Sequence, residues 1–321
     1  MSASILFLMV ALPVCLAIVV ISAGYFVKGA VAIAHRLSIP EFIVGSVIVA
    51  IGTSAPEIAI NVSAVLENAG DIVISNIIGS NIVNVGLGIG IAGMLLTFEK
   101  ARPEYTKTVI LGGLGAVALL LNTIFSSRSG IAVMTLPFAM LLITGFAYFM
   151  YKSLAKSSFE DDNEGLETKI PLILSGVMVI LGAASMAFFS DFSVKYAVAL
   201  SQYMGIPEAV IGATIIAAGG SQPEVSSCIA AAQIKRPNLI LGNIAGSQIF
   251  NIFGILGLSG IIRPFVYATY LWIDITILIA MTVILLLCMH SPVPRKYKGQ
   301  LLISSYAVYT TYLVLIAVQG F

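Results

Sequence analysis

Two glutamates stand inside long apolar segments, and each follows directly on a proline. Glu57 closes the run Gly52-Thr-Ser-Ala-Pro-Glu57, and Glu224 closes the run Gly219-Gly-Ser-Gln-Pro-Glu224. A carboxylate near the middle of a membrane span is costly unless a partner compensates its charge. Neither segment has a Lys or Arg at that depth. The natural counter-charge is therefore a bound cation, shared by both glutamates at the midplane of a membrane.

The prolines would supply further ligands. Pro56 has no N–H, so the carbonyl of Gly52 loses its helical partner and the carbonyl of Thr53 is disturbed. Pro223 acts in the same way on the two glycines before it. Freed carbonyls at membrane depth are tolerated where they line a cavity, and they are good ligands for hard cations. The alternative is a simple kink. We favour the ligand role because a glutamate follows the proline in both places.

A second polar set follows each glutamate. Asn76, Ser80 and Asn84 are spaced i, i+4, i+8, so they share one face of a helix. The same pattern returns at Asn243, Ser247 and Asn251. These groups would complete an oxygen cage with Ser54 and Ser221, although some of them must serve helix–helix hydrogen bonds instead. For the two outermost residues, Asn76 and Asn243, both roles stay open.

The candidate ligands are all oxygen atoms. Carboxylates, amides, hydroxyls and carbonyls suit Ca²⁺ or Na⁺, whereas Zn²⁺ and Cu⁺ prefer His or Cys. The histidines, His35 and His290, fall at segment ends, and the three cysteines are scattered without metal-ligand spacing. Two carboxylates carry a charge of −2, which one Ca²⁺ would neutralise. Two or three Na⁺ would occupy the same oxygens.

The elements that position these residues are membrane helices. Of the 321 residues, 59% are hydrophobic and 10% are charged, and the mean hydropathy is +1.05. A water-soluble globule has too little interior to bury so much apolar surface, so the chain is a polytopic membrane protein. The net charge of +1 excludes a basic field for nucleic acid.

Hydropathy and charged breaks predict ten spans. They lie near residues 4–33, 40–66, 72–97, 106–125, 130–151, 170–199, 207–232, 238–262, 265–290 and 300–319. The long polar stretch within 153–169 divides the chain into a first unit, 1–152, and a second unit, 170–321. Of the Lys and Arg residues, 12 fall in odd-numbered loops and 2 in even-numbered loops. This asymmetry predicts a cell-membrane protein with both termini outside and the linker in the cytoplasm.

The two units are copies. Residues 39–93 align without a gap to 206–260 at an offset of 167, with 19 identities in 55 positions. Each copy has five spans, so the second enters the membrane from the opposite side. The predicted fold is therefore all-α, with ten transmembrane helices in two inverted five-helix repeats, an architecture of many secondary transporters.

The paired motifs resemble the α-repeats of the sodium/calcium exchanger family, within the calcium:cation antiporters. The motifs are Gly52-Thr-Ser-Ala-Pro-Glu57 and Gly79-Ser-Asn-Ile-Val-Asn84, both repeated in inverted form. The resemblance covers nearly the whole chain and is closest to short prokaryotic members. It implies antiport of Ca²⁺ against Na⁺ by alternating access, with no cofactor and no enzymatic activity, and we expect a monomer.

The resemblance also implies a ligand set. Carboxylates would come from Glu57 and Glu224, and the first and sixth helices would act as long sliding gates. The remaining ligands would be the side chains of Ser54, Ser221, Ser80, Ser247, Asn84 and Asn251 and the carbonyls of Ala50, Thr53, Ala217 and Gly220.

Three departures from the family pattern bear on the ions carried. Gly220 replaces a frequent Thr, and Gln248 replaces the usual Asn after Gly-Ser. Asn251 stands where several relatives have Asp, which lowers the charge of the cage by one. Potassium co-transport is disfavoured because that variant of the family favours an acid at this position.

Three other functions compete with this interpretation. A proton-coupled antiporter of the same fold would use a buried Glu to carry H⁺, but no His lies near Glu57 or Glu224 in the sequence. A cation channel would also use oxygen ligands. An intramembrane enzyme has least support, because the chain has no His-Glu-x-x-His and no Gly-x-Ser-x-Gly motif.

Overall fold

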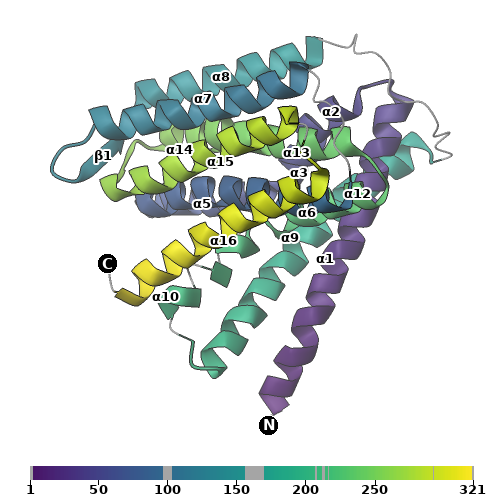
Figure 1. Cartoon of the computed structure of the whole chain (residues 1–321), viewed down its shortest axis with the longest axis horizontal. Coiled ribbons are helices and arrows are strands. Elements are labelled where there is room, and N and C mark those ends of the chain that lie inside the picture. The colour runs from purple at the N-terminus through teal and green to yellow at the C-terminus, as the bar shows by residue number, and fades with distance from the viewer. Residues whose placement is uncertain are drawn as a thin grey trace.

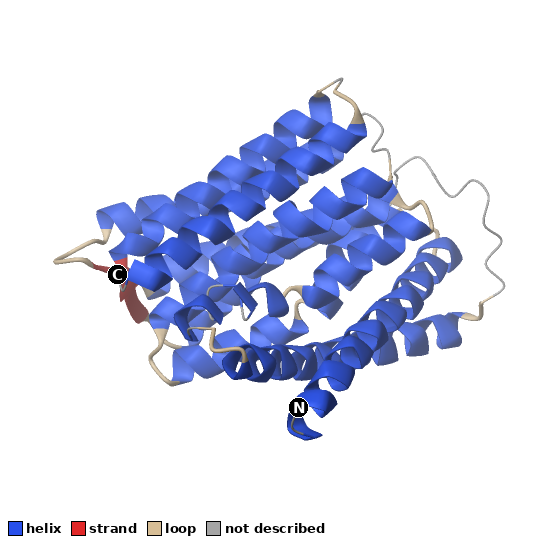
Figure 2. Ribbon diagram, turned by 60° about the horizontal axis from the view of Figure 1, so that its bottom comes forward, coloured by secondary structure: helices blue, strands red, loops and turns tan. Residues whose placement is uncertain are grey.

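Helices form nearly all of the structure that the computed structural model describes. It covers residues 3–96, 103–155, 170–206, 208–211, 214–215, 217–291 and 293–319, so most of the 153–169 linker lies outside it. One pair of long helices, α1 and α9, crosses the remaining helices obliquely (Figure 1). The other helices form a compact bundle beside this pair (Figure 2).

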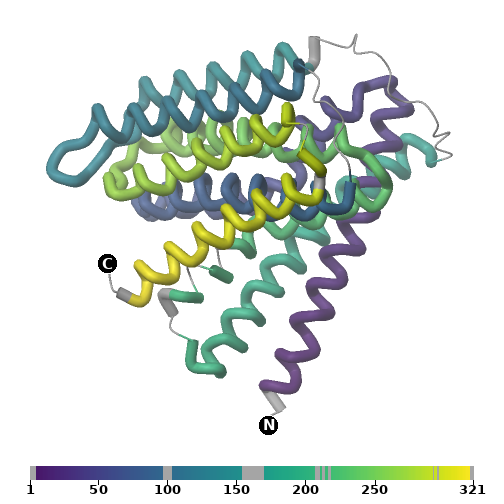
Figure 3. Tube along the Cα trace, viewed as in Figure 1, coloured from purple at the N-terminus to yellow at the C-terminus, as the bar shows by residue number. Residues whose placement is uncertain are grey.

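The crossing pair is longer than a membrane is thick. Helix α1 (Ala3–Arg36) has 34 residues and α9 (Leu172–Tyr203) has 32. At 1.5 Å per residue each is roughly 50 Å long, against about 30 Å for the hydrocarbon core. Both helices must therefore tilt strongly, and Figure 3 shows both running diagonally beside the bundle.

These two helices begin the two halves of the chain, and they run in opposite directions. Arg36, at the end of α1, donates from Nε to the carbonyl of Ile170, 3.2 Å away, just before α9. At the other end, the rings of Phe7 and Tyr196 lie 5.7 Å apart. Equivalent helices thus point opposite ways, as the inverted repeat requires.

The second span is broken in the middle. Its pieces are α2 (Glu41–Val44), the π-helical η1 (Gly45–Val49), α3 (Ala50–Thr53) and α4 (Ala55–Leu66). The chain bends by 50° at the break. The seventh span has the same form, with α10 (Glu208–Ile211), α11 (Ala217–Gly219) and α12 (Gln222–Gln233). Each break falls just before a proline, because proline fits the first turn of a new helix and not a helix interior.

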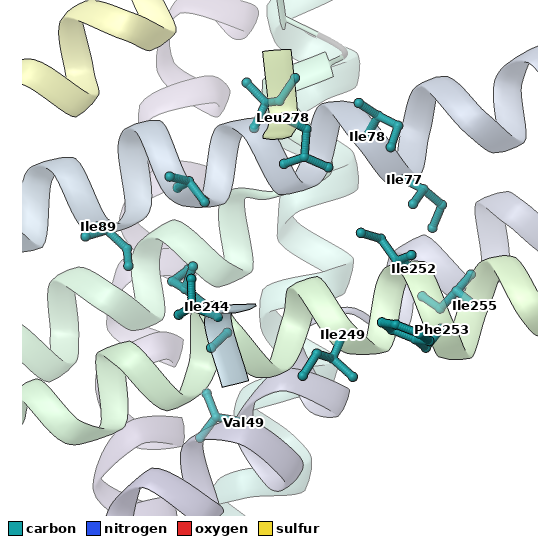
Figure 4. Packing of buried hydrophobic residues seen from close by; sticks show 14 of the residues in the cluster. Val49, Ile77, Ile78, Ile89, Ile244, Ile249, Ile252, Phe253, Ile255 and Leu278 are labelled. Carbon is teal, nitrogen blue, oxygen red and sulfur yellow. The ribbon is translucent and has the colours of Figure 1, made fainter. Parts of the chain in front are cut away.

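The third and eighth spans form the centre of the bundle. They comprise α5 (Gly70–Val83), η2 (Asn84–Ile89) and α6 (Gly90–Leu95), and then α13 (Pro237–Ile249), η4 (Phe250–Ile255) and α14 (Leu256–Ile262). Of their most apolar stretches, 78% and 94% of residues are buried, so these spans contact protein on nearly every side. Figure 4 shows isoleucines of both spans, among them Ile77, Ile78, Ile244 and Ile252, packed in this core.

Glycines allow α13 to lie directly on the backbone of α2 and η1. A methyl group built on Gly246 would lie 2.4 Å from the Cα atom of Ser46. A methyl group on Gly242 would lie 2.4 Å from the carbonyl oxygen of Phe42. Small residues spaced four apart are the usual way for membrane helices to approach this closely. The contact joins the two repeats.

An ion pair closes one end of the same contact. Arg236, just before α13, donates from a guanidinium nitrogen to Glu41 Oε1 of α2 at 2.8 Å. The side chains are 16% and 6% exposed, so water screens this pair little. At the offset of 167 the counterpart of Arg236 is Ala69, so the repeat has no such pair at its other end.

The four outer helices start at other residues than the sequence predicts. They are α7 (Pro103–Phe125), α8 (Leu136–Ala155), α15 (Trp272–His290), which follows the short η5 (Thr269–Leu271), and α16 (Arg295–Gln319). Helices α7 and α16 start a few residues earlier than predicted, and α8 and α15 start later. The residues before α8 and η5 form two antiparallel strands, β1 (Ile131–Met134) and β2 (Phe265–Ala268), with Met134 opposite Phe265. Spans expected from residues 130 and 265 thus begin as a small sheet that ties two loops together.

Within the described residues, eight helices are long and apolar enough to cross a membrane, and the bent pair Glu41–Thr53 and Ala55–Leu66 makes a ninth. The tenth is the corresponding bent segment between α10 and α12, part of which lies outside the described residues.

Candidate cation-binding site

Both glutamates lie in the first turn of a helix that starts inside the bundle. Ser54 and Ser221 form the breaks with almost the same backbone angles, φ −85° and ψ 14° against φ −88° and ψ 10°. Glu57 in α4 and Glu224 in α12 follow three residues later, and both are completely buried. Because the partial positive charge of a helix lies at its N-terminus, this position stabilises a carboxylate.

The breaks bring the two repeats together. Ser54 donates from Oγ to Glu224 Oε1 at 2.8 Å, across the interface between the halves. Ser80 in α5 donates to Glu57 Oε1 at 3.4 Å. Since Ser54 is one helical turn before Glu57, the two carboxylates approach each other from opposite repeats. A serine from the first repeat thus holds one oxygen of each carboxylate.

The remaining oxygens of the site have no partner among the described residues. Buried polar atoms are nearly always hydrogen-bonded, so a group of unpaired ones calls for a physical explanation. The unpaired atoms are Glu57 Oε2, Glu224 Oε2, Ser221 Oγ, Ser247 Oγ, Asn84 Oδ1 and Asn251 Oδ1. All belong to the predicted ligand set, and all are hard oxygen donors of the type that Ca²⁺ and Na⁺ take. The donor set therefore fits such a cation.

The site is not symmetric, although the sequence motifs are. Ser54 and Ser80 are hydrogen-bonded to the carboxylates, whereas their counterparts Ser221 and Ser247 have no partner in the described structure. An inverted repeat that carries ions must have two unequal halves in each state, because only one side is open at a time. The two repeats thus contribute unequally to the contacts of the carboxylates in this structure.

The predicted backbone ligands lie within one turn of the breaks at Ser54 and Ser221. Ala50 O accepts from Ser54 N at 3.1 Å and from Thr53 Oγ1 at 3.3 Å. The Thr53 hydroxyl has one proton and lies closer to the carbonyl of Val49, at 3.0 Å, so Ala50 O keeps a lone pair that could bind a cation. Gly220 lies between α11 and α12 at the edge of a cavity, and Ala217 begins α11.

Two asparagines near the glutamates, Asn61 and Asn81, are not among the predicted ligands. Asn61 lies one turn after Glu57, donates from Nδ2 to the carbonyl of Glu57 at 2.7 Å, and keeps its Oδ1 unpaired in the described structure. Asn81 Oδ1 accepts from Asn251 Nδ2 at 3.4 Å. The spacing of four from Glu57 could have identified Asn61, but its counterpart in the repeat is Cys228. Comparison of the copies therefore discards it.

Gln248, one of the departures from the family pattern, turns away from the site. Its Nε2 donates to Thr282 Oγ1 at 3.0 Å, while the Thr282 hydroxyl donates to the carbonyl of Leu278. Its counterpart Asn81 instead pairs with a site residue. In the repeat, the pair equivalent to Asn81 and Asn251 would be Gln248 and Asn84. Because Gln248 contacts Thr282 instead, both amide atoms of Asn84 are unpaired in the described structure.

Basic side chains do not neutralise the glutamates in the part of the chain that the structure describes. Lys195 pairs with Asp191 at 2.7 Å on the exposed surface of α9, and Lys28 lies 5.9 Å from the ring of Tyr25. The described residues also hold no group of three or more His, Cys, Asp or Glu side chains. Any bound ion would therefore rest on two carboxylates and neutral oxygens.

A cavity of about 880 Å³ leads away from the site between α4, α5 and α9. Pro56 and Gly220, next to the two breaks, line this cavity, and so does Asn76 of α5. Asp71, at the start of α5, and Asp191 add negative charge to its wall. Acidic walls of a narrow cavity concentrate cations.

A fold of inverted repeats with helices broken around a midplane site is that of a secondary transporter. The family described as "Sodium/calcium exchanger protein" matches residues 7–155 and 174–315. The sodium/calcium exchanger MaX1 of Methanosarcina acetivorans is 30% identical and is matched over 90% of this chain and 93% of its own. The putative antiporter CaxA of Alkalimonas amylolytica is 32% identical and is matched over 78% of this chain and 79% of its own.

The fold is also known from experiment. A solved structure of the sodium-calcium exchanger NCX_Mj superposes with a TM-score of 0.80 at 23% identity, covering 96% of this chain and 98% of that one. The predicted all-α fold of ten helices is therefore confirmed. The chain belongs to the sodium/calcium exchanger protein family. It is a multi-pass membrane transporter, a cation antiporter and not an enzyme.

Proposed function

We propose that the protein exchanges Ca²⁺ for Na⁺ across the cell membrane by alternating access. The observation that carries the proposal is the buried contact between Ser54 and Glu224 beside Glu57, surrounded by unpaired oxygens. Two carboxylates from opposite repeats match the charge of one Ca²⁺. The same oxygens would take Na⁺ in its place, so one set of ligands serves both ions in turn.

The proposed ligand set is the one expected from the sequence, with the two acids at its centre. Serine hydroxyls and asparagine oxygens would complete the coordination shell, since Ca²⁺ takes six to eight oxygen ligands. The set comprises Glu57, Glu224, Ser54, Ser221, Ser80, Ser247, Asn84 and Asn251, with the carbonyls of Ala50, Thr53, Ala217 and Gly220.

Movement of α1 and α9 would alternate the access. The two helices pack on each other through small residues and are joined by a hydrogen bond of 2.7 Å between Ser22 and Ser185. A methyl group on Gly29 would lie 2.8 Å from the carbonyl oxygen of Ser175, so their backbones are close. A pair joined in this way would slide over the bundle as one body.

We further propose an orientation with both termini outside and the linker in the cytoplasm. The excess of Lys and Arg in the odd-numbered loops supports it. The units 1–152 and 170–321 would then be the two repeats of a monomer. In this orientation the cavity beside Asp71 opens to the outside.

Replacing Asp71 by Asn is expected to raise the apparent KM for external Ca²⁺ by about two- to fourfold at low salt. This is the effect of removing one charge about 10 Å from a divalent ion in water. An amide oxygen can still accept the hydrogen bond from Ala268 N, which measures 2.6 Å in the structure. The measurement is initial Ca²⁺ uptake in liposomes at two ionic strengths.

Asp191→Asn is the matched comparison for this variant. Asp191 lines the same cavity, but Lys195 already neutralises it at 2.7 Å. We expect a smaller change in KM for this variant. Equal changes in KM for both variants would show that Asp71 does not attract Ca²⁺ by its charge. A change in KM for Asp71→Asn that high salt does not reduce would show the same.

Coupling to protons is the second candidate, because a buried glutamate can carry H⁺. Both histidines end helices: His35 lies in the last turn of α1, and His290 closes α15. Neither is thus placed as a proton partner for the glutamates. We expect Ca²⁺ uptake into liposomes under a Na⁺ gradient, and none under a pH gradient alone. Uptake driven by the pH gradient without Na⁺ would replace the sodium proposal with the proton one.

A further inference from the structure

A second cavity, of about 300 Å³, is lined by residues of α2, α7 and α8, and none of the predicted ligands is among them. It adjoins the start of α7 and the end of α8, where these apolar helices leave the membrane on the side that carries most of the basic residues. Phe42 and Phe149, both buried, form its floor, and the exposed ring of Tyr148 stands at its edge. The cavity thus combines an apolar interior with a position at the membrane surface.

Two lysines face this cavity. Lys107 lies one turn into α7, and Lys152 lies in the last turn of α8. Neither forms an ion pair with a carboxylate in the described part of the chain, and Lys152 Nζ is 5.8 Å from the ring centre of Tyr148. Two unpaired ammonium groups on one small cavity at the membrane surface attract a phosphate group.

The same cavity has hydroxyl groups and one acid. Thr108 and Ser153 line it, and so does Glu104. The Thr108 hydroxyl donates to the carbonyl of Glu104 at 2.9 Å, so it is left as an acceptor. Glu104 repels a bare phosphate but accepts hydrogen bonds from hydroxyl groups. The wall therefore matches a headgroup that carries both a negative phosphate and free hydroxyls.

We propose that this cavity binds an anionic phospholipid with a hydroxyl-bearing headgroup, of the phosphoglycerol type. The phosphate lies between Lys107 and Lys152, and the headgroup hydroxyls face Glu104. The acyl chains follow the apolar wall at Leu111 and Tyr148 into the membrane. A lipid fits better than a soluble phosphate ester because the cavity is largely apolar and opens beside lipid-facing helices.

The site would connect α2 to the outer helices. Phe42 of α2 stacks on Tyr105 of α7, with ring centres 4.3 Å apart and planes 20° from parallel. A headgroup in the cavity adds a second link between the same elements. Because α2 continues through η1 and α3 to the break at Ser54, bound lipid is expected to stabilise the fold around the second span.

The test uses the purified full-length chain in detergent, with lipid adducts counted by native mass spectrometry and thermal stability measured in parallel. We expect phosphatidylglycerol to bind and raise the melting temperature, and phosphatidylcholine to do neither. The double variant K107Q/K152Q should bind phosphatidylglycerol about thirtyfold more weakly, since each basic residue near the headgroups contributes about 1 kcal/mol. The variant K235Q/K296Q, which removes two exposed lysines outside the cavity, should behave as the parent.

Phosphatidic acid tests the acid in the cavity, because it has the phosphate but lacks the hydroxyls. The parent should prefer phosphatidylglycerol over phosphatidic acid, and Glu104→Gln should reduce that preference. Equal binding of phosphatidylglycerol by K107Q/K152Q and the parent would overturn the site. Equal binding of phosphatidylglycerol and phosphatidic acid by the parent would overturn the headgroup assignment. Both readouts are independent of transport, so they stand whether or not the exchange proposal holds.

Discussion

Glu57→Gln and Glu224→Gln should each reduce Ca²⁺ exchange by about a hundredfold or more, while the protein stays folded. The amide keeps the volume of the side chain but removes one of the two buried charges. In the exchanger with Ca²⁺ bound as proposed, each carboxylate forms a buried ion pair with the cation, and removing one partner of such a pair costs about 3–5 kcal/mol. The measurement is Na⁺-driven uptake of Ca²⁺ in liposomes, together with the elution profile and melting temperature of each variant.

Glu67→Gln provides the matched control. Glu67 follows the same helix, α4, and is exposed, with a hydrogen bond from Ser63 at 3.4 Å. Its exchange rate should equal that of the parent. If Glu57→Gln or Glu224→Gln retains near-normal Ca²⁺ flux, that residue is not a ligand. If both variants unfold, Ser221→Ala takes their place, and its Ca²⁺ binding is compared with that of the parent. The Ser221 hydroxyl has no partner in the described structure, so its removal breaks no hydrogen bond.

Gly246→Ala is a substitution outside the site for which we expect a large loss of stability. The new methyl group would lie 2.4 Å from the Cα and the carbonyl oxygen of Ser46. Because both atoms belong to the backbone of η1, no side chain can move aside, and overpacking of this type costs about 1–3 kcal/mol or more. We expect a lower melting temperature in detergent and a smaller monodisperse fraction.

The repeat supplies the control for this prediction. Gly79 occupies the position equivalent to Gly246 at the offset of 167, yet a methyl group there would have nothing within 4 Å. Gly79→Ala should therefore leave the melting temperature unchanged. Equal destabilisation by both variants would show that the two glycines serve backbone freedom in the helix, and not the contact between α13 and η1.

Much of the architecture could be predicted because the membrane restricts the choices. Apolar length sets the spans, and an odd number of spans per copy requires inversion. The positions of Pro56 and Pro223 fix where the second and seventh spans break. The strands β1 and β2 were missed because their residues, such as Ile131 and Val133, are as apolar as a helix start. Only their pairing across the chain distinguishes them.

The site could be predicted in its residue types but not in its contacts. Spacing along one helix places Asn76, Ser80 and Asn84 on one face, but it does not say which helix they meet. The donation from Ser54 to Glu224 depends on how the repeats cross, and this is set by the close approach at Gly246. The hydrogen bond from Gln248 to Thr282 likewise depends on the position of α15, a helix in which the sequence shows no motif.

The pair of Glu41 and Arg236 has a consequence for the resting state of the transporter. Two identical inverted halves would make the outward-open and inward-open forms exact images of each other, and therefore equal in energy. An attachment present at one end and lacking at the other, where Ala69 stands for Arg236, removes that degeneracy. If access alternates as proposed, identical halves would have no built-in preference for either side, whereas these two unlike halves would.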